Sequence, residues 1–74
     1  MDSNKKYLLI IGSPIDYEEL VVYIEVNNER IALLQKEEGE NNMKIEFFGE
    51  QIKSEIYLDV LLEALSEAKK ELMK

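Results

Sequence analysis

The pattern that most constrains this chain is a strict alternation of side chains over residues 20–26, followed by a polar link of four residues, 27–30. A period of two residues is typical of a β-strand with one face on the core. The core face is expected to carry Leu20, Val22, Ile24 and Val26. Because the link is too short for a crossover, the next apolar segment, 31–36, must return antiparallel. Asn27 and Asn28 tolerate the positive φ angles of such a tight turn.

Two further apolar segments extend this hairpin into a meander. Residues 7–11 form a continuous apolar run, which favours a strand buried on both faces or one paired early in a sheet. Residues 43–48 alternate again after the polar turn 37–42, which predicts another strand. Residues 51–58 fit either a loop or a short edge strand.

The last segment predicts a helix. Asp59 suits its N-cap, because a carboxylate can accept hydrogen bonds from the first backbone amides. Apolar residues recur on one helical stripe at Leu61, Leu65, Ala68 and Leu72. Two pairs are spaced for weak ion pairs, Glu67 with Lys70 and Glu71 with Lys74. We therefore expect an α+β fold in one domain, residues 1–74. An antiparallel β-meander of three to four strands would carry one C-terminal helix packed on it.

The composition argues against several classes of chemistry. The 74 residues include 16 acidic and 9 basic side chains, a net charge of −7, with no histidine and no cysteine. The chain therefore lacks the usual proton shuttle at neutral pH, the thiolate nucleophile and the commonest transition-metal ligands. The acidic turn 37–40 also lacks the ligand spacing of a calcium-binding loop. We expect no enzyme, no cofactor and no metal site.

The same composition limits the partners. The apolar run 7–11 is too short for a signal-peptide core or a membrane span, and the lack of cysteine favours a cytoplasmic protein. An acidic chain is a poor ligand for nucleic acid or anionic membranes. A cationic protein is the natural complement, because opposite electrostatic fields speed association. The alternative is that the charge only keeps a small domain soluble.

The candidate contacts with a partner are acidic and aromatic. The acidic candidates are Glu18, Glu19, Glu37, Glu38 and Glu40, and the aromatic anchors are Tyr17 and Tyr23. The two acidic groups come before one strand and after its neighbour, so they need not be adjacent in space. Tyr23 and Phe48 lie either on an exposed sheet face or beneath the helix. A register shift of one residue would exchange the two faces, so both interpretations stay open.

Four segments carry a resemblance to known proteins, namely YEELV (17–21), IALLQKEEG (31–39), KIEF (44–47) and LDVLLEALSEAK (58–69). They resemble a family of small bacterial proteins, the immunity proteins encoded beside contact-dependent inhibition or other polymorphic toxins. The resemblance implies a protein that binds and neutralises a cognate toxin domain by occluding its active site. A basic nuclease cleft would suit an acidic inhibitor.

Two other functions fit the same composition. One is an acidic mimic of nucleic acid that inhibits or regulates a DNA- or RNA-binding enzyme. The other is a small homo-oligomeric scaffold module, in which a strand edge or the helix pairs with a second copy.

Overall fold

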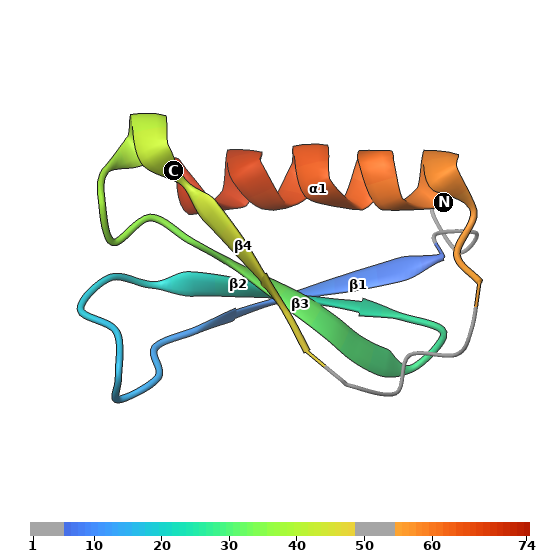
Figure 1. The fold of residues 1–74 in the computed structure, drawn as a ribbon, viewed down its shortest axis with the longest axis horizontal. Coiled ribbons are helices and arrows are strands. Elements are labelled where there is room, and N and C mark those ends of the chain that lie inside the picture. The colour runs from blue at the N-terminus through green and yellow to red at the C-terminus, as the bar shows by residue number, and fades with distance from the viewer. Residues whose placement is uncertain (1–5, 49–54) are drawn as a thin grey trace.

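The computed structural model describes residues 6–48 and 55–74, and it has the predicted α+β architecture (Figure 1). The strands are β1 (Tyr7–Gly12), β2 (Val21–Val26), β3 (Glu29–Gln35) and β4 (Lys44–Phe47). They form one antiparallel sheet in chain order. A short 3-10 helix, η1 (Glu40–Asn42), precedes β4, and the α-helix α1 (Leu58–Leu72) lies over β1, β2 and β3.

The hairpin of β2 and β3 turns at the predicted asparagines, whose φ angles are 55° at Asn27 and 67° at Asn28. Its register shifts between Ile24 and Glu25. A period of two residues along segment 31–36 predicts that Ile31 shares a face with Leu33, and this prediction is wrong. The irregularity places one extra residue in β3, so that Ile31 joins the helix-side core together with Ala32.

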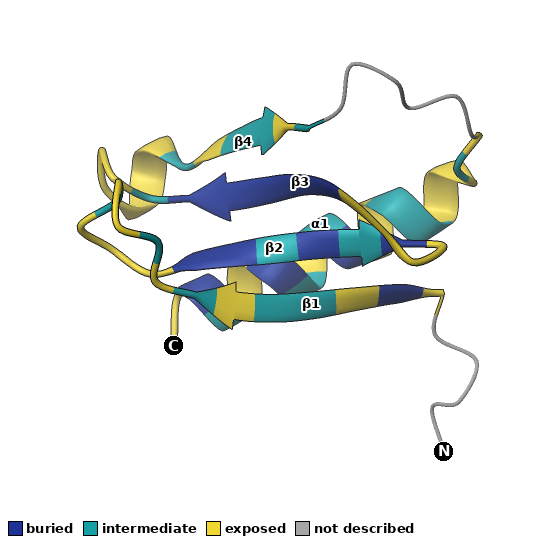
Figure 2. Cartoon of the chain, turned by 90° about the horizontal axis from the view of Figure 1, so that it is seen from below, coloured by how far each residue is buried: buried dark blue, intermediate teal, exposed yellow. Residues whose placement is uncertain are grey.

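The core lies between α1 and the two central strands. Strands β2 and β3 contribute Val22, Ile24, Val26, Ala32 and Leu34, and α1 contributes Ala64, Ala68 and Leu72. The two alanines let the helix backbone approach the sheet closely. Figure 2 shows the resulting gradient, with β2 and β3 mostly buried and β1 and β4 partly exposed. The predicted stripe of α1 does face the core, although Leu61 and Leu65 are only half-buried.

Strand β1 does not have the burial on both faces that its apolar run favoured. It pairs with β2 and forms one edge of the sheet, so that Leu8 is 55% and Ile11 is 50% exposed. Leu20 was also expected on the core face, but it precedes β2 and is 52% exposed.

The helix begins one residue before the predicted N-cap. Tyr57 occupies the cap position without a side-chain cap bond, and Asp59 lies in the first turn, where it still faces the positive end of the helix dipole. The sequence left segment 51–58 open between a loop and a short edge strand. Residues 51–54 lie outside the described part of the chain, and residues 55–57 have no regular structure. Within the described ranges no helix has the length and apolar character needed to cross a bilayer.

Candidate protein-binding site

The sheet face opposite α1, here called the far face, carries the aromatic side chains of Tyr23 and Phe48. Tyr23 and Phe48 lie there with their ring centroids 6.4 Å apart, which decides against a position beneath the helix. The Arg30 guanidinium lies 4.2 Å from the Tyr23 ring centroid and also contacts Glu25 at 3.2 Å. Tyr23 is therefore partly covered by Arg30 and is only half-buried, so it offers part of its ring to a partner.

The Tyr23 ring also depends on a glycine in the neighbouring strand. A Cβ atom added to Gly12 would lie 2.6 Å from Cε2 of Tyr23, closer than real side chains approach. Gly12 therefore permits the ring to lie directly on β1.

The loop between β1 and β2, residues 13–20, is joined to β4 across the far face. The Tyr17 hydroxyl donates a hydrogen bond to Oε1 of Glu46 at 2.7 Å. Gln35 Nε2 donates to the other oxygen of Glu46 at 3.0 Å, and Gln35 Oε1 accepts the backbone N–H of Glu37 at 3.0 Å. This chain of bonds connects the loop, β4 and the end of β3.

The Glu37 carboxylate fixes the same loop from the other side. It accepts the backbone N–H groups of Glu18 at 3.1 Å and Glu19 at 2.7 Å. Two candidate groups that the sequence left apart are therefore adjacent in space. Glu37 acts here as a hydrogen-bond acceptor within the protein, whereas the side chains of Glu18 and Glu19 are exposed.

The other two acidic candidates face lysines. Glu38 Oε2 lies 2.7 Å from Lys44 Nζ, and Glu40 Oε2 lies 3.8 Å from Lys36 Nζ. The hydrogen bond to Glu38 raises the pKa of Lys44. Lys36 also donates to the backbone carbonyl of Leu72 at 3.0 Å, close to the C-terminal end of α1. Because such exposed ion pairs are weak, the two carboxylates stay available to a stronger cationic partner.

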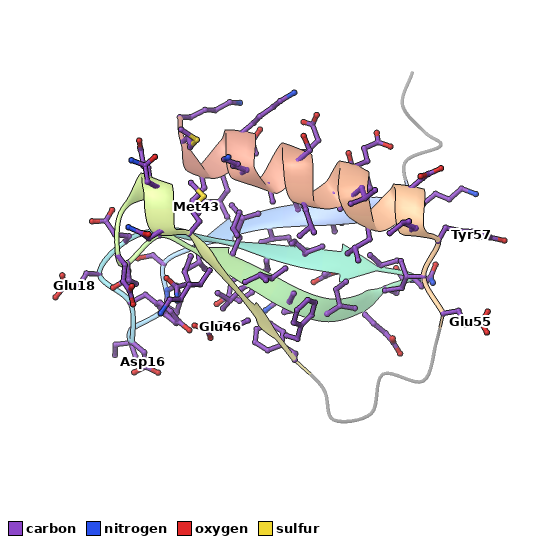
Figure 3. The ribbon with its side chains drawn as sticks, turned by 45° about the horizontal axis from the view of Figure 1, so that its top comes forward. Asp16, Glu18, Met43, Glu46, Glu55 and Tyr57 are labelled. Atoms are coloured by element: carbon purple, nitrogen blue, oxygen red, sulfur yellow. The ribbon has the colours of Figure 1, made fainter. Side chains whose placement is uncertain are left out.

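We call segments 13–20 and 36–46 together the acidic end. They carry seven acidic side chains and two lysines, so five of the seven net negative charges of the chain lie in them. In Figure 3, Asp16, Glu18 and Glu46 lie at this end of the molecule, far from Glu55 and Tyr57. Folding therefore concentrates a charge that is dispersed along the sequence.

Two ionisable groups of the acidic end have shifted pKa values. The hydrogen bonds from Tyr17 and then Gln35 lower the pKa of the Glu46 carboxyl. The bond to Glu46 raises the pKa of the Tyr17 phenol to about 12. Near neutral pH the pair is therefore a charged acceptor and a neutral donor, which is the combination that the bond requires.

The sequence analysis missed two residues that organise this site, Gln35 and Glu46. Gln35 is a buried polar residue, with 7% of its surface exposed. Both ends of its amide are hydrogen-bonded, one to Glu46 and the other to the backbone of Glu37. A glutamine within the apolar segment 31–36 was the available signal. Among the described residues, no group of three or more acidic, histidine or cysteine side chains is placed to hold a metal ion. The arrangement provides exposed carboxylates and aromatic surface, which suit the binding of cationic groups.

Comparison of the chain with models of protein families gave no match. Comparison with curated proteins and with solved structures gave no match either.

Proposed function

We propose that this protein is an immunity-type inhibitor that binds a cationic partner protein through its acidic end. The observation that carries the proposal is the concentration of five of the seven net charges in segments 13–20 and 36–46. The favoured partner is a nuclease toxin domain, because an enzyme that binds nucleic acid presents a basic cleft. Carboxylates placed in that cleft would occupy the positions of the phosphates and exclude the substrate.

The hydrogen bonds of the acidic end support binding by a surface that is already ordered. Glu37 holds the backbone of Glu18 and Glu19, and Tyr17 is bonded to Glu46. A loop fixed in this way loses less conformational entropy when a partner binds. The exposed carboxylates of Glu18 and Glu19 are therefore the first contacts that we assign to the partner.

The size of the protein fits a single interface of ordinary area. Stable complexes bury about 800 Å² on each partner, whereas the accessible area of this protein is 5572 Å². The acidic end, with Tyr23 as an aromatic anchor on the adjoining far face, would contribute most of such an interface.

A pull-down from the source cells with the tagged protein, at low and at moderate salt, tests the proposal. We expect a basic partner that is retained at low salt and released as salt rises, because added ions screen exposed charges. The recovered protein is then assayed for cleavage of DNA and RNA, and addition of the untagged wild-type protein should stop that cleavage.

The control is a pair of variants with the same change in net charge. Glu18→Lys with Glu19→Lys alters the acidic end, whereas Glu55→Lys with Glu63→Lys alters exposed sites outside it. We expect only the first variant to lose the partner. Equal losses in both variants, or a partner without nuclease activity, would contradict the proposed function.

A further inference from the structure

The two edges of the sheet differ in the features that prevent association with another strand. The β4 edge is four residues long and carries Lys44 and Glu46. The β1 edge is six residues long, has no charged residue and no proline, and pairs with β2 without a bulge. Short length, charges, proline and bulges are the devices by which edge strands avoid further pairing. Strand β1 has none of them.

No described strand pairs with the outer side of β1 from Leu8 to Gly12. β1 is the first strand in the sheet order and has β2 as its one neighbour there. An edge strand directs about half of its backbone N–H and C=O groups away from its neighbour. The exposed side chains of Leu8 and Ile11 add apolar surface at the same edge.

A groove follows this edge on the helix side. It has a volume of about 350 Å³, and its apolar lining comes from β1, namely Tyr7, Leu8, Leu9 and Ile11. The opposite wall is acidic and consists of Glu67 and Glu71 of α1. Glu67 contacts the exposed Lys70 of α1 at 3.7 Å, and Glu71 contacts the exposed Lys74, just beyond the end of α1, at 3.0 Å. Such exposed pairs contribute little stability.

We propose that the β1 edge binds an extended cationic segment of a partner protein as a fifth strand of the sheet. In an added strand, alternate side chains point to the helix side and to the far face. Basic residues on the helix side would reach Glu67 and Glu71, while apolar residues on the far face would cover Leu8 and Ile10.

The spacing of the glutamates suits this occupant. α1 crosses the sheet obliquely, and its C-terminal half, which carries Glu67 and Glu71, lies over β1 (Figure 2). Residues four apart on a helix are separated by about 6 Å along its axis. Alternate residues of a strand are separated by about 6.7 Å. Two successive basic residues on one face of the added strand can therefore each face one of the two glutamates.

Charge decides between this occupant and a second copy of the chain. Two β1 edges paired antiparallel about a twofold axis would place both helices on one face, with their rows of Glu67 and Glu71 near each other. Each copy also carries a net charge of −7. Like charges across an interface oppose association, whereas basic side chains are attracted to the same groove.

This inference goes beyond the proposed function, because it concerns the strand edge and the groove beside Glu67 and needs no toxin partner. Ile11 and Glu71 of the groove also border a small pocket with Glu19 and Lys36 of the acidic end, so the control variant avoids Glu19. The test titrates the ¹⁵N-labelled protein with a synthetic peptide of alternating valine and lysine that is as long as β1. We expect chemical-shift changes at β1, Glu67 and Glu71, and slower hydrogen exchange at the β1 amides that point outwards.

Two controls separate strand addition from charge attraction. The same peptide with alternate amides N-methylated keeps its charge but loses the hydrogen bonds of one edge, and we expect at least about tenfold weaker binding. The variant Glu67→Lys with Glu71→Lys should also bind the unmodified peptide about tenfold less tightly. Glu18→Lys with Glu38→Lys has the same change in net charge at exposed positions that do not line the groove, and it should retain the affinity within about threefold.

Four outcomes would overturn the inference. They are no binding of the peptide, equal binding of the N-methylated peptide, an equal loss in the two double variants, or protection of β1 through dimerisation of the protein alone in analytical ultracentrifugation. The first three leave the pull-down result for the acidic end unaffected, so failure of one proposal is distinguishable from failure of the other.

Discussion

The two faces of the sheet are held by different kinds of contact. On the helix side, Ile24 and Ala32 pack against apolar residues of α1. On the far face, the contacts are a guanidinium over a tyrosine ring and a chain of hydrogen bonds through Glu46. Apolar packing tolerates an exchange of similar side chains, whereas each polar contact needs a particular donor or acceptor. Stability is therefore concentrated on the helix side, and the placement of the acidic end depends on the far face.

The two faces do not differ simply in burial, because the far face also contains buried side chains. Val21 and Leu33 belong to the far face, and both are buried. Loop 13–20 and the side chains of Tyr23 and Phe48 lie on this face, so the far face has a small second layer without a second helix. The layer lies beside the acidic end and gives its loop a support.

The largest expected effect is on the helix side. Ile24 is fully buried, so Ile24→Ala should lower the free energy of unfolding by about 2–5 kcal/mol, measured by urea denaturation. Leu62→Ala removes an exposed leucine from α1 and should cost less than about 0.5 kcal/mol. Similar losses in the two variants would show that packing under the helix is not the main source of stability.

A smaller loss is expected where the far face depends on Gly12. Gly12→Ala places a methyl group in the space of the Tyr23 ring, and such overpacking costs about 1–3 kcal/mol. The loss should shrink when Tyr23→Ala is also present, because the clash is then absent. If Gly12→Ala costs the same free energy of unfolding in the presence of Tyr23→Ala, the cost arises from the backbone of β1 and not from a clash with the ring.

Glu37→Ala should affect the order of the loop more than global stability. It removes the acceptor of two exposed hydrogen bonds, so the free energy of unfolding should fall by about 1 kcal/mol or less. The amide hydrogens of Glu18 and Glu19 should then exchange faster with solvent. Glu37→Gln keeps one acceptor oxygen and should fall between the wild type and the alanine variant. Unchanged exchange rates in the alanine variant would show that the order of loop 13–20 does not depend on this carboxylate.

The smallest effect concerns pH. The lowered pKa of Glu46 means that its stabilising contribution is present above its unfolded-state pKa and is lost as the pH falls through the folded-state value. The pKa of Tyr17 is raised from 10.0 to about 12, so its contribution is present below 10.0 and is lost as the pH rises toward 12. Ultraviolet titration of wild type and Tyr17→Phe should isolate one phenol that ionises near pH 12. A Tyr17 midpoint near 10 would contradict the bond.

Local patterns predicted the helix side well and the far face poorly. Alternation placed Val22, Ile24 and Val26 correctly, and the two asparagines marked the turn. Ile31 was misplaced because a register shift changes the face of a residue without changing the pattern of the sequence. The bond from Tyr17 to Glu46 joins residues 29 positions apart, and periodicity carries no information about such a pair. The grouping of Glu18 and Glu19 with Glu37 depends on the path of loop 13–20, which propensity does not determine.

The strand order also affects how the protein folds. Each strand pairs with its neighbour in the chain, and α1 follows the last strand. Hairpins form in about 1–10 μs, and a high share of contacts between residues near in sequence favours fast folding. The sheet can therefore form from local contacts, and its apolar face stays open until α1 packs on it.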